Sequence, residues 1–238
     1  RGRWLIDATG RRRLLARELD LGEPSGHFAH AAWFRLEGRL DVGHLVPEHD
    51  REWHARDPDQ IRWLSTSHLM GEGYWVWIIP LSSGMTSVGI VAHGAVHAFD
   101  TMSTLERARD WIEAHEPALH AHLGELEVAD FRCLKDFSYT ASRVFSKDRW
   151  ALVGEAGLFV DPFYSPGSDF IALANTFTTE LVRADLAGQP IGELVAHLDH
   201  FYRRLAHVST ATYKDAAKVY GQPRVLPAKI YWDNTNYW

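Results

Sequence analysis

The stretch that decides the fold runs from Ala151 to Phe170 and reads ALVGEAGLFVDPFYSPGSDF. It begins with a short apolar run that is typical of a buried strand, and this strand ends at Gly154. A loop bounded by prolines follows, and an apolar helix is predicted from about Ser168 to Leu186. A strand, a glycine turn and a helix in this order are typical of folds that bind dinucleotides.

The turn within this stretch carries the residue types that a cofactor site needs. Its glycines allow a flat ligand to approach the main chain closely. Glu155, just past the strand end, is placed to accept a hydrogen bond from a ribose-type hydroxyl. The helix start near Ser168 offers backbone N–H groups and the positive end of the helix dipole. Spacing alone also allows an ordinary strand-to-helix turn in which Ser168 caps the helix.

A second element of this kind lies at the start of the sequence, where residues 3–10 read RWLIDATG. The apolar run that ends in small residues predicts a buried strand followed by a turn. A buried parallel strand needs neighbours on both sides, and no strand precedes this one in the sequence. We therefore expect the sequence to be the C-terminal part of something larger, or to pair with a further segment.

The region between these two elements is predicted to form an antiparallel or mixed sheet with one helical segment. The expected strands are residues 28–40, 61–68, 74–81, 85–93, 127–133 and 137–145. Residues 82–84, Ser-Ser-Gly, predict a hairpin turn. The helical segment is expected at 101–123, capped by Thr101 or Ser103 and split at Pro117.

The C-terminal region is predicted to be helical. After residues 188–190, a long helix is expected from about Ile191 to Tyr220. The aromatic tail 229–238, KIYWDNTNYW, is expected to pack on the body of the protein. The whole pattern predicts an α/β fold of mixed α+β character.

Composition excludes several kinds of partner. The net charge of −6 argues against nucleic acid, because binding to phosphates requires a basic face. The basic run at residues 11–13 is expected to be a solvated loop or helix start. The longest apolar run, residues 74–81, is much shorter than the roughly 20 residues of a membrane span. No signal peptide is recognised, and the single cysteine, Cys133, fits a reducing, cytoplasmic setting as a half-buried strand residue.

The 14 histidines do not form a recognisable metal motif. His93 and His97 have a possible ligand spacing, as do His115, His120 and His122, but no H-E-x-x-H pattern accompanies them. We therefore expect no metal site.

Three motifs occur in a fixed order along the chain: WLIDATG at 4–10, WVWIIP at 75–80 and LVGEAGLFVDPFYSPGSDFIALAN at 152–175. The first and third resemble the two FAD-contacting elements of aromatic-hydroxylase-type oxidoreductases. The second resembles the W-x-W-x-I-P element of the flavin-dependent, tryptophan-halogenase-like family. The resemblance covers only the C-terminal part of that family, and it implies a glutathione-reductase-type FAD-binding fold.

The resemblance also implies which residues contact the cofactor FAD. They are Ala8, Thr9, Gly10, Gly154, Glu155, Asp161, Pro162, Gly167 and Ser168. Glu155 stands where the family has aspartate, so the carboxylate reaches one methylene further. A halide would lie at Ser165 and Gly167, although Pro166 between them has no N–H to give.

Tyr164 stands where tryptophan-specific members of the family carry a glutamate. The resemblance therefore favours a phenol, a pyrrole or a carrier-bound aromatic substrate over free tryptophan. The family's G-x-G-x-x-G element and its active-site lysine are absent from this sequence. We expect them in a segment of about a hundred residues or more that precedes Arg1. None of the five lysines matches the context of the active-site lysine, so the catalytic residue is unknown.

Two tryptophans mark the central strand. Strand alternation places Trp75, Trp77 and Ile79 on one face, and Tyr74, Val76 and Ile78 on the other. The resemblance implies that Trp75 and Trp77 form a wall of the flavin chamber, which excludes water. Core packing against the strand at 85–93 explains the same two rings without any function.

The sequence thus predicts four parts: residues 1–27 end the FAD-binding part, 28–145 form a substrate-side sheet and helix, 146–187 form the second FAD-contacting block, and 188–238 form a helical region and tail. The expected function is that of a halogenase-like oxidoreductase that uses FADH2 and O2, with a separate flavin reductase as partner. A monooxygenase or reductase of the same superfamily is the first alternative. A non-catalytic fragment that lacks its FAD-binding half is the second.

Overall fold

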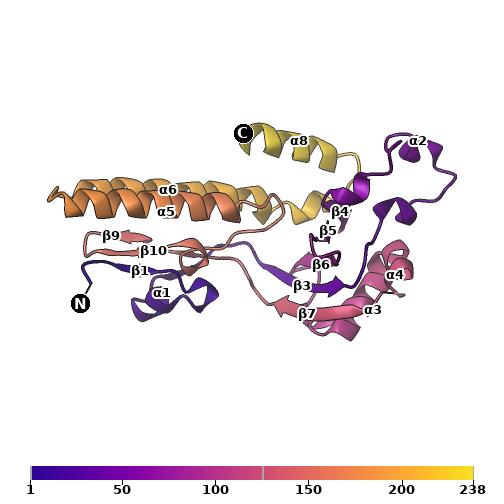
Figure 1. Cartoon of the computed structure of the whole chain (residues 1–238), viewed down its shortest axis with the longest axis horizontal. Helices are drawn as coiled ribbons and strands as arrows, with labels where there is room; N and C mark the ends of the chain where they lie inside the picture. The colour runs from indigo at the N-terminus through magenta and orange to yellow at the C-terminus, as the bar shows by residue number, and fades with distance from the viewer. Residues whose placement is uncertain (1, 125, 238) are drawn as a thin grey trace. The chain divides into compact units, whose positions relative to one another are not determined.

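The computed structural model describes residues 2–124 and 126–237. Contacts between residues divide the chain into two compact units, and each unit is built from two separate segments. The first unit comprises residues 1–28 and 137–215, and the second comprises residues 29–136 and 216–238. Figure 1 labels their elements along the chain.

The first unit contains two small sheets and two long helices. Its elements are β1 (Leu5–Asp7), η1 (Gly10–Arg12), α1 (Leu14–Glu18), β2 (Gly22–Pro24), β8 (Tyr139–Ala141), β9 (Phe145–Ser146), β10 (Trp150–Leu152), η5 (Gly154–Ala156), α5 (Gly167–Leu186) and α6 (Gly192–Lys214). One sheet has the order β1-β10-β9, and β2 pairs with β8 in the other. β1 and β10 run parallel to each other.

The helices α5 and α6 lie side by side in the first unit (Figure 1). The buried residues of α5 include Phe170, Ala174 and Leu181, which recur at helical spacing and form one apolar face. Tyr202 of α6 joins the helices, because its ring lies 5.6 Å from the ring of Phe170 and its hydroxyl donates to the Phe170 carbonyl at 3.2 Å. The same ring contacts Phe145 of β9 at 5.7 Å, so the helix pair packs on the sheet.

The second unit contains a five-stranded antiparallel sheet and short helices. Its elements are β3 (Ala29–Leu36), η2 (Val42–Leu45), α2 (Arg51–His54), η3 (Arg62–Leu64), β4 (Ser67–Gly71), β5 (Tyr74–Pro80), β6 (Thr86–His93), η4 (Phe99–Thr101), α3 (Leu105–His115), α4 (Pro117–Leu123), β7 (Val128–Leu134), α7 (Ala217–Tyr220) and α8 (Leu226–Tyr237). The sheet has the order β4-β5-β6-β3-β7.

The core of the second unit lies on one face of this sheet. Val76, Ile78 and Ile90 from the strands pack with Ile112 of α3 and Leu119 of α4. All five side chains are fully buried, and each contributes about 1.5–3 kcal/mol relative to an exposed position. Cys133 lies half-buried on β7, so the strand position predicted for it is confirmed.

Two predicted turns of the second unit are confirmed. The hairpin at 82–84 joins β5 to β6, and the Leu81 N–H donates to the Met85 carbonyl across it. Pro117 divides the helical segment, because α3 ends at His115 and Pro117 begins α4. Proline fits that first helical position because its missing N–H would have no partner there.

The predicted cap and the predicted strand nearby are wrong. Thr104, rather than Thr101 or Ser103, caps α3 by accepting from the Arg107 N–H at 3.3 Å. Residues 61–68 do not form one strand, because the Asp57 carboxylate accepts from the N–H groups of Ile61 and Arg62 and holds a turn there. The strand begins at Ser67 instead.

The strand predicted within residues 3–10 is confirmed as β1, but the prediction that it is buried is wrong for Leu5 and Ile6. β1 pairs with β10 only, among the strands that the structure describes, and so forms the edge of its sheet. The side chains of Leu5 and Ile6 are consequently 55% and 46% exposed.

The C-terminal predictions need two corrections. The helix expected at 191–220 is two helices, α6 and α7, because the backbone leaves helical geometry at Asp215. The aromatic tail forms α8, but Tyr231 and Trp232 are 78% and 69% exposed, so these rings are not packed. The prediction for Trp238 lies outside the described residues.

Candidate functional site

The two strand-turn elements of the sequence meet in the first unit. Leu5, Ile6 and Asp7 of β1 are in register with Trp150, Ala151 and Leu152 of β10. Because the strands are parallel, both turns leave the same edge of the sheet. The Val153 N–H donates to the Asp7 carbonyl at 3.0 Å and joins the two strand ends.

A buried carboxylate that the motif analysis did not single out builds the first turn. The carboxylate of Asp7 accepts from the Thr9 N–H at 2.9 Å, the Thr9 hydroxyl at 2.6 Å and the Leu15 N–H at 2.7 Å. Burial acts to raise the pKa of Asp7, but these hydrogen bonds outweigh it and hold the pKa below its ordinary value. The carboxylate thereby fixes the positions of Ala8, Thr9 and Gly10. An aspartate two residues before a threonine is typical of an Asx turn, and this pattern could have indicated Asp7 in the sequence.

The second turn depends on glycine. Gly154 has a φ of +56°, a left-handed conformation that other residues adopt at a cost. A Cβ there would also lie 3.4 Å from Cγ1 of Ile171. Gly154 therefore lets the chain turn sharply at the strand end, directly beside the first residues of α5.

A cavity of about 300 Å³ opens between this turn and the start of α5. It lies wholly within the first unit. The residues that line it are Gly154, Glu155, Leu158, Phe159, Val160, Asp161, Pro162, Ser165, Gly167, Ser168, Phe170 and Ile171. The structure thus brings together six of the residues predicted to bind the cofactor, from Gly154 to Ser168, with Ser165 of the predicted halide pair.

Glu155 presents a carboxylate at the edge of this cavity. Its side chain is partly exposed, and Oε2 lies 3.7 Å from Nη1 of Arg11. Its main chain is held, because the Tyr139 hydroxyl donates to the Glu155 carbonyl at 2.7 Å. An exposed carboxylate on a fixed backbone is suited to accept from a ligand hydroxyl.

The basic run at 11–13 is not simply solvated. The guanidinium of Arg13 lies 4.0 Å from the centre of the Tyr139 ring, and that of Arg11 lies 5.2 Å from the rings of Tyr139 and Phe159. Arg12 is exposed, as expected for a solvated run, whereas Arg11 and Arg13 lie over aromatic rings and are only partly exposed. Burial lowers the pKa of Arg13 from its ordinary value.

Asp161 is buried and its carboxylate is used within the protein. Oδ1 accepts from the Phe163 N–H at 2.9 Å, and Oδ2 lies 2.7 Å from Nε2 of His27. Both side chains are almost completely buried. The pair therefore holds the loop 161–166 that leads into α5. His27 was not predictable from the sequence, because it lies 134 residues from Asp161 and no motif surrounds it.

The start of α5 combines a strained residue with a proline. Ser165 has a φ of +55°, a conformation that costs a non-glycine residue about 1–2 kcal/mol. Its N–H donates to the Pro162 carbonyl at 2.9 Å, and Pro166 has no N–H. Within residues 165–167 this leaves the N–H of Gly167, the first residue of α5, available for a ligand.

Trp75 and Trp77 lie in the second unit, on β5. The predicted alternation is confirmed, because Tyr74, Val76 and Ile78 belong to the core while the tryptophans occupy the opposite face. The two rings lie 5.7 Å apart. Trp75 is only 2% exposed and the Trp77 ring lies against Gly89 of β6, so both rings are packed within the unit, and their role as a chamber wall stays a prediction.

Two further features bear on the site. Within the described ranges, histidine, cysteine and acidic side chains form no group of three or more that could hold a metal ion. In the same ranges, every helix is too short or too polar to cross a membrane.

Comparison with known proteins relates the chain to one group of enzymes. No family model matches it. It is 27% identical over 176 residues to the flavin-dependent halogenase chlA of Dictyostelium discoideum, which covers 72% of this chain and 29% of the relative. It is 28% identical over 170 residues to the 1H-pyrrole-2-carbonyl-[peptidyl-carrier protein] chlorinase of Pseudomonas fluorescens, covering 70% and 35%. It is 30% identical over 198 residues to the tetracycline 7-halogenase of Kitasatospora aureofaciens, covering 77% and 34%. The chain thus spans about a third of the length of these relatives.

Solved structures agree on the fold. The halogenase PltM in complex with phloroglucinol and FAD superposes with a TM-score of 0.79 at 16% identity, over 92% of this chain and 44% of that one. The flavin-dependent brominase Bmp2 superposes with a TM-score of 0.69 at 21% identity, over 95% and 53%. The chain therefore has the fold of the FAD-dependent oxidoreductases of the glutathione-reductase type. Its sequence relatives are the flavin-dependent halogenases, and the resemblance drawn from its three motifs is confirmed.

Proposed function

We propose that this chain forms part of an FAD-dependent halogenase that acts on an activated aromatic substrate with FADH2 and O2. One observation carries the proposal: the turn after β10 and the first turn of α5 enclose one cavity, and six of the residues that the halogenase motifs pick out, from Gly154 to Ser168, line it. Sequence similarity to flavin-dependent halogenases supports the same reading.

The residues of the cavity fit part of a flavin dinucleotide. Its volume, about 300 Å³, is at the lower end of the range for small-molecule sites, so it accommodates a portion of FAD. Leu158, Phe159 and Ile171 offer apolar surface to a flat ring. Gly154 allows close approach, and Glu155 offers an acceptor to a hydroxyl.

The chemistry divides between the cofactor and the protein. Bound FAD, once reduced, would supply two electrons that bring O2 to the peroxide level, and that oxidant would then take two electrons from a halide. The N-terminal end of α5 contributes a positive dipole, which favours electron-rich oxygen atoms near Gly167 and Ser168. The His27–Asp161 pair keeps the loop before α5 in place. Trp75 and Trp77 carry no acid or base, so their role in this proposal is to exclude water and to position the substrate.

The proposed substrate is a phenol, a pyrrole or an aromatic acyl group on a carrier. Tyr164 replaces a carboxylate that would attract the ammonium group of a free amino acid, and its ring packs against Phe163 at 4.5 Å and Tyr213 at 5.8 Å. One relative is named as a pyrrole-2-carbonyl carrier-protein chlorinase, which supports the carrier-bound option. A separate flavin reductase is the proposed source of FADH2.

Turnover by the full-length protein tests this function. The protein is incubated with FAD, a flavin reductase, NADH and either chloride or bromide, and mass spectrometry is used to detect halogenated phenols, indoles, pyrroles and carrier-bound pyrroles. We expect a halogen isotope pattern on at least one substrate. The absence of any halogenated product across the whole panel would refute the proposal.

A second candidate function is a monooxygenase or reductase without halogenation. The start of α5 favours it, because the Ser165 N–H is used in the turn and Pro166 has none, which leaves little backbone to hold a halide. In that case NADH consumption would rise with substrate and would not depend on halide. The same assay with and without halide separates the two functions.

A third candidate is a chain that does not bind FAD by itself. It predicts weak or undetectable FAD binding by the 238-residue chain, since no G-x-G-x-x-G element is present. Titration of the isolated chain with FAD, followed by flavin fluorescence, measures this. Micromolar affinity would show that the chain holds the cofactor without further segments.

A further inference from the structure

A second cavity, of about 320 Å³, lies within the first unit, apart from the candidate cofactor cavity. Its walls come from the paired strands β2 and β8, from the turn after β2 and from one side of α6. Of the residues that line the two cavities, only Leu158 is shared. A ligand in the second cavity therefore does not enter the space that the cofactor motifs surround.

The lining of this cavity is basic, although the chain as a whole carries a net charge of −6. Two arginines and two histidines of α6 contribute to it: His200, Arg203, Arg204 and His207. Their spacing of three, four and seven residues places them on one side of the helix. The lining contains one acidic residue, Glu23 of β2. Charges of one sign in a concave surface raise the local concentration of the opposite ion, so the cavity favours an anion.

Asp199 holds the first of the two arginines in place. Its Oδ1 accepts from the N–H groups of Val144 at 2.7 Å and Phe145 at 3.1 Å, which fixes the carboxylate. Its Oδ2 accepts from Nε of Arg203 at 2.8 Å. Among the described residues, the two terminal nitrogens of this guanidinium have no hydrogen-bond partner. They are therefore available to a ligand.

Arg204, His200 and His207 supply donors that the protein does not use. All three are exposed, and within the part of the chain that the structure describes their side chains make no hydrogen bond or ion pair. The charge of Arg204 is thus uncompensated, whereas Arg203 is paired with Asp199. A guanidinium stays charged at neutral pH and matches the oxygen atoms of a phosphate with two parallel hydrogen bonds.

The rest of the lining indicates what else the anion carries. The hydroxyl residues Ser25 and Thr140 add polar groups, and four residues add apolar surface: Pro24, Ala141, Leu158 and Ala206. The volume lies at the lower end of the range for small-molecule sites, so there is room for more than a bare phosphate group. A phosphate joined to a compact carbon body fits this lining.

We propose that this cavity binds a small phosphate ester, with the phosphate at Arg203 and Arg204 and the carbon body against Leu158 and Ala206. The site goes beyond the proposed function and does not depend on it. Glu23 opposes the binding of an anion, and its removal provides a test of opposite sign.

Isothermal titration calorimetry of the full-length protein saturated with FAD tests this site. Saturation with FAD fills the cofactor site, so the heat of an added ligand reports a separate site. The probes are phenyl phosphate, inorganic phosphate and benzoate. We expect saturable binding of phenyl phosphate, and weaker binding of inorganic phosphate because it lacks the carbon body. Benzoate should bind most weakly, since it carries less charge and fewer acceptor oxygens. The lack of saturable binding for both phosphates, or equal affinity for benzoate, would overturn the proposal.

Substitutions of exposed charges locate the site. Arg204→Gln should weaken the binding of phenyl phosphate about fivefold or more, a moderate effect because residue 204 lies at the surface. Glu23→Gln should strengthen it. Arg183→Gln is the matched control, because it removes the same charge from an exposed position of α5 in the same unit, outside the cavity. It should leave the affinity unchanged. Equal losses for Arg204→Gln and Arg183→Gln would reveal a general effect of net charge and contradict the site.

The remaining outcomes also decide the matter. If Arg204→Gln does not fold, His207→Gln takes its place, since this exposed residue lines the same cavity. A loss of affinity is then expected, and an unchanged affinity would overturn the proposal. If the protein does not bind FAD, the same titrations and variants are run without it, and the same results are expected. Displacement of bound FAD by phenyl phosphate would place the probe in the cofactor site and rule out a second site.

Discussion

Asp7 shows how one buried carboxylate can shape the whole first turn of the candidate site. Three donors converge on it, two from Thr9 and one from Leu15. Ala8, Thr9 and Gly10 were predictable from the sequence because they form a motif. The Asx-turn pattern before Thr9 could have indicated Asp7, but the donor from Leu15 follows only from the fold.

Asp7→Asn should destabilise the protein. The amide can accept at one atom only and directs an N–H group at a donor, so we expect a loss of about 1–3 kcal/mol in the free energy of unfolding. Urea unfolding at pH 7 measures it. Glu18→Gln, an exposed charge loss in the same unit, is the control and should have little effect. Equal midpoints for Asp7→Asn and wild type would contradict the assigned role.

The same carboxylate should make stability depend on pH in a defined direction. Its pKa is lower in the folded than in the unfolded state, so the folded state binds fewer protons. The stabilisation is complete above the ordinary pKa of an aspartate, 3.8, and is lost as the pH falls through the lowered value. The difference between wild type and Asp7→Asn should therefore shrink below about pH 4.

His27 is expected to matter as much as the motif residue that it contacts. His27→Leu removes the partner of the Asp161 carboxylate within a buried environment, which should cost about 1–3 kcal/mol. His197→Leu, at an exposed position of α6, is the control. Thermal unfolding measures both. In the full-length protein, FAD affinity should fall for His27→Leu alone, and an unaltered affinity would show that the loop before α5 does not need the pair.

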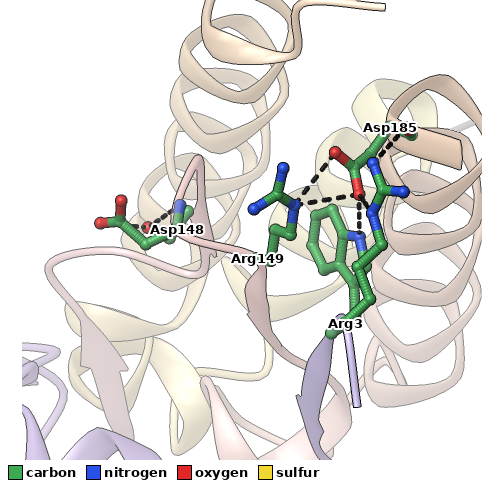
Figure 2. Close-up of polar contacts among 6 residues, drawn as sticks. Arg3, Asp148, Arg149 and Asp185 are labelled. Carbon is green, nitrogen blue, oxygen red and sulfur yellow. Dashed lines mark hydrogen bonds and ion pairs between the residues drawn. The ribbon is translucent and has the colours of Figure 1, made fainter. Parts of the chain in front are cut away.

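At the scale of elements, Asp185 joins three parts of the first unit. Figure 2 shows its carboxylate between Arg3, at the start of β1, and Arg149, at the start of β10, with Asp148 pointing away. Nε of Arg3 lies 2.6 Å from Oδ2, and Nε of Arg149 lies 3.0 Å from Oδ1. The indole N–H of Trp4 donates to the same carboxylate at 2.9 Å. These donors hold the pKa of Asp185 well below its ordinary value, and the hydrogen bond from Arg3 has the largest effect.

Asp185→Asn should weaken the attachment of β1 and β10 to the end of α5. We expect a lower thermal midpoint at pH 7 and a smaller effect from Asp148→Asn, whose carboxylate accepts from the Ser146 hydroxyl in its own turn. Because the pKa of Asp185 is lower in the folded state, its contribution to the free energy of unfolding is present above about pH 4. This contribution is lost as the pH falls through the lowered pKa. Equal midpoints for the two variants would contradict the role given to Asp185.

Elements were predictable where local chemistry decides them. A proline within a helical pattern interrupts the helix, and Pro117 does so between α3 and α4. The apolar spacing of α5 is likewise visible in its sequence. The turn at 62–64 was missed because it depends on Asp57, a side chain outside the strand pattern. The sequence shows that no strand precedes β1, but the exposure of Leu5 and Ile6 follows only from the order of strands in the sheet. The packing of the Trp77 ring against Gly89 could not be predicted, because it depends on the register of β5 against β6.

At the scale of the whole molecule, the chain forms two units that each combine distant segments. Residues 1–28 fold with 137–215, and 29–136 fold with 216–238. Periodicity is a local property, so the sequence pattern alone could not reveal this pairing. The four parts predicted from the sequence remain a prediction.

The division predicts where a local change is felt. Hydrogen exchange of the chain with Asp7→Asn should show faster exchange at amides of the first unit, such as those of β10. Amides of β6, in the second unit, should change less, because most contacts lie within units. A uniform increase across both units would indicate a single cooperative structure.

The exposed β1 edge also affects how the chain behaves in the test tube. It carries two protruding aliphatic side chains, Leu5 and Ile6, and the structure describes no strand along its outer side. Such an edge is a template on which another molecule can add a strand, and repeated addition leads to aggregation. Concentrated stocks of this chain should therefore scatter light progressively more with time. Purification and storage at low concentration, with scattering monitored before each titration, will keep the FAD-binding measurements interpretable.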